Sequence, residues 1–149
     1  MASLRVLFIG EIVGKSGVWV VKELLPKVRE EKHIDFVVAD GEGATGGFGI
    51  GKNHAVYLHK LGIDAITTGE CSYYKKDIVE HFNRAPYMIR PANYPPRNPG
   101  RGFMVFEKNG RKVAVMSLLA WQASSAFTSR TRSACCPSCW KESRRRPTR

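Results

Sequence analysis

Carboxylate side chains follow three apolar segments of this sequence, at the points where buried strands are expected to end. Glu11 follows the first segment and Glu70 follows the third, whereas the second is followed by an acidic pair, Asp40 and Glu42. Because the carboxyl ends of parallel strands lie at one edge of a sheet, these side chains are expected to converge there. Crowded carboxylates repel one another unless a cation lies between them, so the pattern indicates a hard divalent metal site. The alternative is that each carboxylate is simply solvated in its loop.

The segments that precede these carboxylates have the composition of strands buried on both faces. Residues 4–10 form a continuous apolar run that ends in glycine, and residues 35–39 form a second run. Residues 63–67, with the sequence IDAIT, form a third. Continuous apolar runs of this length are typical of strands in a parallel sheet that is covered on both sides.

Segments with helical periodicity separate the predicted strands. Ser16 is expected to cap a helix whose apolar side begins at Val18, and Pro26 predicts a kink or a break within that helix. Residues 53–61 and 75–83 predict two further helices. The chain therefore alternates strand and helix three times.

The next patterned segment predicts a β-hairpin. Asn109 and Gly110 form a two-residue turn signal between apolar segments that begin at Phe103 and Val113. Residues 90–102, which are rich in Pro, Gly and Asn, predict an irregular connection before the hairpin. The order of elements predicts a layered α/β fold with a mainly parallel start.

The chain has 149 residues and a net charge of +11, and its basic excess is concentrated near the end. Residues 120–149 hold seven of the Lys and Arg residues, one acidic residue and no Leu, Ile or Val, so little stable structure is expected there. A basic tail of this kind is suited to nucleic acid, and the alternative is a solvated, disordered tail. The sequence shows no signal peptide and no run of about 20 apolar residues, which predicts a cytoplasmic protein without a membrane span.

Four motifs occur in order along the sequence: LFIGEIVGKSG, ADGEGATGGFGI, DAITTGECSYYKKDI and RPANYPP. Over residues 4–119 they resemble the YmdB-like family of bacterial calcineurin-like metallophosphoesterases. The resemblance implies a layered α-β-β-α metallophosphoesterase-like sandwich, of which this chain holds the N-terminal portion only. It also implies a two-metal site, with iron or manganese, that hydrolyses phosphodiesters such as cyclic nucleotides.

The resemblance assigns roles to particular residues. Glu11 stands where the family has a metal-binding Asp, and Glu42 matches a metal-binding Glu. Gly43 stands in place of a ligating Asn and has no side chain to offer. Glu70 replaces a ligating Asn, and Cys71 replaces the His expected to protonate the leaving group. The resemblance thus implies Glu11, Glu42 and Glu70 as metal ligands and Cys71 as the candidate general acid, a role that a thiol fills less readily than an imidazole.

The remaining ligands of the family are histidines of a C-terminal half that this sequence does not match. Residues 1–119 are therefore expected to be the N-terminal part of a metallophosphoesterase-like domain, and residues 120–149 a basic Ser/Arg/Cys-rich tail that is disordered or translated out of frame. The predicted function is a metal-dependent phosphodiesterase that is truncated and catalytically impaired. The alternatives are a non-catalytic degenerate fragment and a nucleic-acid-binding module that uses the tail. Self-association is also expected, because half of a layered fold exposes apolar sheet surface.

Overall fold

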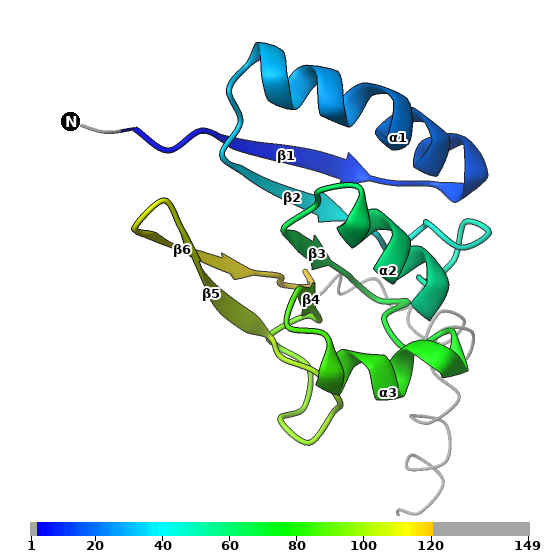
Figure 1. Ribbon diagram of the computed structural model, residues 1–149. Coiled ribbons are helices and arrows are strands. Elements are labelled where there is room, and N and C mark those ends of the chain that lie inside the picture. The colour runs from blue at the N-terminus through cyan, green and yellow to red at the C-terminus, as the bar shows by residue number, and fades with distance from the viewer. Residues whose placement is uncertain (1–2, 121–149) are drawn as a thin grey trace, which may run out of the picture.

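A four-stranded parallel sheet forms the centre of the computed structural model, which describes residues 3–120 (Figure 1). Its strands are β1 (Val6–Glu11), β2 (Phe36–Asp40), β3 (Ala65–Thr67) and β4 (Met88–Ile89). They pair in the order β1-β2-β3-β4, and every pair is parallel. Each strand therefore lies beside the strand that follows it in the chain.

Three helices connect these strands and lie on one face of the sheet: α1 (Gly14–Glu31), α2 (Lys52–Lys60) and α3 (Lys76–Arg84) (Figure 1). A parallel sheet with sequential strand order and right-handed connections requires this one-sided arrangement. The helices bury their apolar sides against the sheet and form the larger of two cores with it. That core includes Val21, Leu58, Ile66, Ile78 and Phe82.

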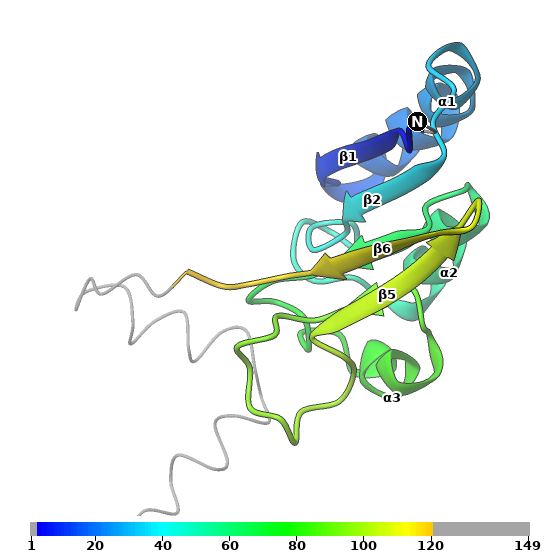
Figure 2. The ribbon, with the colours of Figure 1, turned by 90° about the vertical axis from the view of Figure 1, so that its left-hand side faces the viewer.

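The opposite face of the sheet is covered by a β-hairpin, β5 (Phe103–Lys108) and β6 (Arg111–Met116), which are antiparallel. Figure 2 shows this hairpin in front of the parallel sheet. Its turn residues have φ values of 51° at Asn109 and 69° at Gly110, as the predicted two-residue turn requires. The hairpin and the sheet enclose a second, smaller core of Phe36, Val38, Ala65, Ile89 and Val115.

The described residues thus form three layers, of helices, parallel sheet and hairpin, which confirms the predicted fold class. The three predicted strands, three predicted helices and the hairpin all occur, with bounds that differ by a few residues. The predicted tail boundary at residue 120 cannot be compared, because residues 121–149 lie outside the described residues. Between residues 3 and 120, no helix is both long enough and apolar enough to cross a membrane.

The first helix differs from its prediction at two points. α1 begins at Gly14, and its N-cap is Val13, with no side-chain capping hydrogen bond, so the predicted cap at Ser16 is wrong. The helix also continues through Pro26, so the predicted break does not occur. Pro26 lies on the exposed side of α1, whereas Leu25 beside it is buried in the core. Packing of the buried side therefore holds the helix together across the missing backbone hydrogen bond.

The fold leaves apolar side chains exposed on several surfaces, two of which are the open face of β1 and the outer face of the hairpin. In β1, Leu7 packs towards the helices, so its neighbours Val6 and Phe8 point to the other face, where they are 48% and 65% exposed. The hairpin does not extend over β1 (Figure 2). On the hairpin itself, the side that faces away from the sheet exposes apolar side chains too. Two of them are Phe103 and Met116, which are 62% and 58% exposed.

We expect this chain to associate with itself through these exposed surfaces, because apolar patches of this kind are uncommon on monomers. Size-exclusion chromatography with light scattering should give a mass above the 16.7 kDa of one chain. The double variant Phe8→Lys/Phe103→Lys should shift the protein towards the monomer. The matched control is Trp19→Lys, an exposed apolar residue on α1, which should leave the mass unchanged. A wild-type chain that elutes as a clean monomer would contradict this expectation.

Candidate metal and phosphodiester site

The carboxyl ends of β1, β2 and β3 are joined by backbone hydrogen bonds. The Ile12 N–H donates to the Asp40 carbonyl over 2.8 Å, which joins the end of β1 to the end of β2. The Gly41 N–H donates to the Thr67 carbonyl over 3.0 Å, which joins the end of β2 to the end of β3. The loops after the three strands therefore start from fixed, neighbouring positions, as the parallel arrangement predicts.

Glu42 lies at the centre of these loops. Its own N–H donates to Asp40 Oδ1 over 3.0 Å, and its Oε1 accepts a hydrogen bond from the Cys71 N–H. The Glu42 carboxylate therefore connects the loop after β2 to the loop after β3. This contact places the second and third predicted carboxylate positions, residues 42 and 70, at one place in the fold.

The pKa of the Glu42 carboxyl is raised to about 7, first because partial burial removes the charged form from water. The hydrogen bond from Cys71 opposes this rise, since it stabilises the charged form. The negative charges of Asp40, Glu70 and Glu11 raise the pKa further. Burial also raises the pKa of Asp40. Asp40, Glu70 and Glu11 thus lie near enough to Glu42 to act on its carboxyl electrostatically, and Glu11 and Glu70 are exposed.

The loop that carries Glu70 and Cys71 is a tightly bonded turn. Thr68 and Ser72 are buried, and their hydroxyl oxygens lie 2.8 Å apart. The Ser72 hydroxyl donates to the Gly69 carbonyl over 2.5 Å. Cys71 is 5% exposed, so its side chain points into the protein while its N–H points to Glu42. The candidate acid is therefore less accessible than the carboxylates around it.

The RPANYPP motif supports this turn from outside, a role that the sequence analysis missed. The Tyr94 hydroxyl lies 3.2 Å from the Gly69 carbonyl and 3.1 Å from the Glu70 carbonyl. Arg90, which is buried, donates to the Pro91 carbonyl over 2.8 Å and shapes the start of the same segment. The RPANYPP motif itself was the only feature of the sequence that pointed to a role for this segment. An irregular Pro-rich segment has no periodicity from which its contact with the Glu70 turn could be predicted.

A metal centre requires several donors around one point, and the site meets this requirement only in part. Carboxylate oxygens are suitable donors for hard divalent cations. Among residues 3–120, however, no three His, Cys, Asp or Glu side chains are grouped so that they could hold one ion. The described residues therefore supply donors of the right kind but do not by themselves form a complete metal centre.

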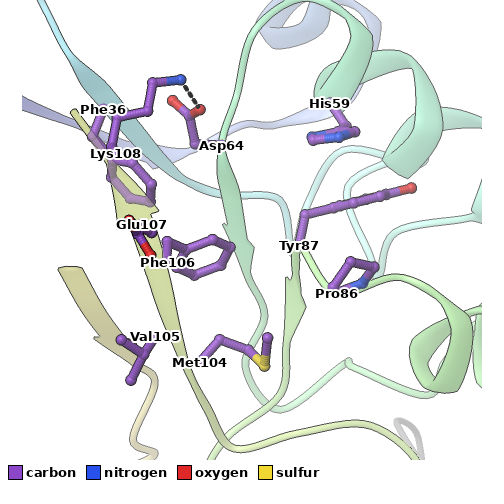
Figure 3. A pocket seen from close by; sticks show the side chains of 10 residues that line it. All are labelled: Phe36, His59, Asp64, Pro86, Tyr87, Met104, Val105, Phe106, Glu107 and Lys108. Carbon is purple, nitrogen blue, oxygen red and sulfur yellow. Dashed lines mark hydrogen bonds and ion pairs between the residues drawn. The ribbon is translucent and has the colours of Figure 1, made fainter. Parts of the chain in front are cut away.

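A hollow of about 410 Å³ lies at the opposite ends of the strands from the carboxylates (Figure 3). Phe36 begins β2, and Asp64 and Tyr87 precede β3 and β4, so the hollow is near the amino ends of the strands. Lys108 Nζ lies 3.0 Å from Asp64 Oδ1 on one wall, and Tyr87 stacks on His59 on the other. None of the predicted site residues lines it, so the carboxylate cluster remains the candidate site.

The described residues thus form a layered α/β fold, with helices on one face of a parallel sheet, a second sheet on the other and carboxylates at the strand ends. The pattern of the YmdB-like protein family matches residues 7–133, and the chain belongs to that family. The match begins at Leu7, the first residue of the motif LFIGEIVGKSG, and continues beyond residue 119.

Relatives of known or assigned activity support this membership. The chain is 37% identical over 115 residues to the 2′,3′-cyclic-nucleotide 2′-phosphodiesterase of Bacillus subtilis, covering 77% of this chain and 44% of that protein. It is 30% identical over 131 residues to a putative phosphatase/phosphodiesterase of Mycoplasma genitalium, covering 85% of this chain and 47% of that protein.

Solved structures give the same result for the fold. A crystal structure described as a novel phosphatase of Mycoplasma pneumoniae has a TM-score of 0.75 at 28% identity, covering 80% of this chain and 44% of that one. A hypothetical protein of Thermus thermophilus has a TM-score of 0.72 at 31% identity, covering 77% of this chain and 44% of that one. The chain thus spans less than half the length of the relatives that it matches.

Removing the Tyr94 hydroxyl should loosen the turn that carries Glu70. We expect Tyr94→Phe to lower the free energy of unfolding by about 1 kcal/mol, the usual value for one lost hydrogen bond to a carbonyl. Urea denaturation followed by circular dichroism would measure it. Tyr57→Phe, at a tyrosine that is 39% exposed, is the matched control. Equal stability of the Tyr94 variant and wild type would show that this hydroxyl does not support the turn.

The raised pKa of Glu42 predicts a pH-dependent stability. Between about pH 4.5 and 7 the folded state keeps a proton that the unfolded state releases, so stability falls as the pH rises through this window. Glu42→Gln cannot ionise and should therefore be more stable than wild type at pH 8. The gain in the free energy of unfolding should be only about 1 kcal/mol, because solvent screens a partly exposed carboxyl. The difference should disappear below pH 4.5.

Thermal melts of both proteins at a series of pH values would measure this difference. Glu80→Gln, at an exposed glutamate of α3, serves as the control and should show no such pH-dependent gain. A Glu42→Gln variant that is less stable than wild type at pH 8 would mean that the charged carboxylate is favourable in the fold.

Proposed function

We propose that this chain is the amino-terminal part of a metal-dependent phosphodiesterase that acts on cyclic nucleotides or similar small phosphodiesters. The observation that carries the proposal is the presence of Asp40, Glu70 and Glu11 near Glu42, whose carboxyl pKa is raised first by burial and then by these like charges. Nearby like charges of this kind attract a cation. The named activity of the Bacillus subtilis relative supports the substrate class.

In this proposal Glu11, Glu42 and Glu70 are the donors that this chain contributes to a divalent iron or manganese ion. Glu42 is the central donor, since it lies between the loops after β2 and β3. Glu11 and Glu70 approach from the loops after β1 and β3 and are exposed to solvent. Cys71 occupies the position of the general acid. Because its side chain is buried, it is poorly placed to donate a proton to a leaving group.

The chain alone is proposed to be catalytically impaired. Its described residues lack a complete group of metal donors, and it spans less than half of its relatives. The remaining donors would have to come from outside residues 3–120. The alternative of a non-catalytic fragment shares the fold but predicts no metal binding and no hydrolysis.

Three expectations from the sequence stay predictions. The cytoplasmic location is one of them. Nucleic-acid binding and out-of-frame translation concern residues 120–149, nearly all of which lie outside the described residues. Reading the coding DNA in the other two frames would test the frame hypothesis, which fails if neither frame resumes strand-like segments and histidines.

Metal binding can be tested by thermal melts with excess Mn²⁺ and with chelator. A ligand that binds only the folded state raises the melting midpoint, so the wild-type midpoint should rise with Mn²⁺. Glu42→Gln should remove most of this rise, whereas the exposed control Glu80→Gln should keep it. A cooperative wild-type transition that ignores Mn²⁺ would exclude the proposed metal role.

Hydrolysis can be compared directly with a complete relative. We expect turnover of 2′,3′-cyclic AMP by this chain to be at least about 100-fold below that of the Bacillus subtilis enzyme, the usual contribution of a general acid. Turnover equal to that enzyme would show that the chain is not impaired.

A further inference from the structure

Two glycines of the site lie where an added side chain would meet a carboxylate. A Cβ atom added to Gly43 would lie 2.5 Å from Glu11 Oε1 and 3.3 Å from Glu11 Cδ. It would also lie 3.2 Å from the Ile12 carbonyl oxygen. The carboxylate of Glu11 thus occupies the place of a Cβ at position 43, and this exposed carboxylate would have to move aside for any side chain there.

The second glycine has the same relation to the central carboxylate. A Cβ atom added to Gly69 would overlap Glu42 Oε2 and would lie 2.8 Å from Glu42 Cδ. Glu42 has little freedom to move away, because its Oε1 is bonded to the Cys71 N–H two residues further along the same turn. A side chain at Gly69 would therefore have to break that hydrogen bond.

These glycines are required for space and not for backbone conformation. Seven glycines of residues 3–120 have positive φ values, and neither Gly43 nor Gly69 is among them. An alanine at either position is therefore compatible with the backbone dihedral angles, and the shortest contact that it would make is with the carboxylate that lies against it. Gly10 also has no positive φ, and an added Cβ there meets nothing within 4 Å, so it offers a matched control.

We propose that Gly43 and Gly69 are positioning residues that set the places of the two carboxylates, Glu11 against Gly43 and Glu42 against Gly69. Position 11 and position 43 then share one space, so that only one of them can place side-chain atoms there. A shorter acid at position 11 withdraws its carboxylate and makes room for a side chain at position 43. The glutamate at position 11 and the glycine at position 43 are a matched pair.

This arrangement also accounts for the incomplete grouping of donors. Glu11 lies over the backbone of Gly43, and Glu42 lies against Gly69 with one oxygen bonded to an N–H. Each carboxylate therefore lies against its own glycine, and the two do not face one shared point. The relevance of this arrangement to metal binding rests on the proposed function, whereas the steric pairing does not.

A double-mutant cycle tests the pairing without metal. The variants are Glu11→Asp, Gly43→Ala and the double variant Glu11→Asp/Gly43→Ala, with Gly10→Ala as the control. Substitutions of residues in contact have non-additive effects on stability. The melting midpoint of the double variant should therefore be higher than the value expected from adding the two single-variant shifts to the wild-type midpoint. Additive shifts, or a Gly43→Ala protein that melts like Gly10→Ala, would overturn the pairing.

The Gly69 contact has a separate readout. In ¹H–¹⁵N spectra without metal, the Cys71 amide resonance should move upfield in Gly69→Ala, because the hydrogen bond to the Glu42 carboxylate is lost. Gly10→Ala should leave that resonance in place. An unchanged Cys71 resonance in Gly69→Ala would refute the positioning role of Gly69.

The same variants connect the pairing to the metal. The Mn²⁺-dependent rise of the midpoint should be lost in Gly43→Ala and regained in Glu11→Asp/Gly43→Ala, whereas Gly10→Ala should keep the wild-type rise. A Gly43→Ala protein that keeps the full rise would contradict the positioning of Glu11 for metal. If wild type itself shows no rise with Mn²⁺, the proposed function fails, and the cycle and the Cys71 resonance still decide the positioning role.

Discussion

The hydrogen bond from the Cys71 N–H to the Glu42 carboxylate is the contact on which the rest of the site depends. It joins the loop after β2 to the loop after β3 and holds a carboxylate among three other negative charges. The parallel sheet brings the two loops together, and the Thr68–Ser72 pair and Tyr94 keep the turn in shape. The charged form of Glu42 is disfavoured by burial and by the neighbouring negative charges. The hydrogen bond from the Cys71 N–H stabilises that charged form and so offsets part of this cost.

Much of this fold follows from local patterns in the sequence. Apolar runs before Glu11, Asp40 and Glu70 predicted the strands, and Asn109-Gly110 predicted the hairpin turn, because burial and turn geometry act over few residues. The convergence of the carboxylates followed from the parallel order alone. The strand β4 was not predicted, since Met88 and Ile89 are too few to show a period.

The finer geometry of the site could not be predicted in this way. That Glu11 fills the space beside Gly43 depends on contacts between separate loops, which no spacing along the chain encodes. The role of Tyr94 is equally non-local, because its hydroxyl reaches residues about 25 positions away. The family resemblance implies that Gly43 replaces a ligand, whereas the structure gives that glycine a steric partner, Glu11.

The sequential order of the strands has a consequence for how this protein is made. Each strand of the parallel sheet pairs with the one before it in the chain, so pairing can proceed in the order of synthesis from the amino end. Connections between neighbouring strands keep the sequence separation of paired residues as short as the crossover helices of a parallel sheet allow. The loops that carry Glu11, Glu42 and Glu70 have therefore all been synthesised once the third βα unit has left the ribosome, and Tyr94 of the following segment then supports the last of them. The nascent chain can build this edge of the site before the hairpin that covers the other face has been translated.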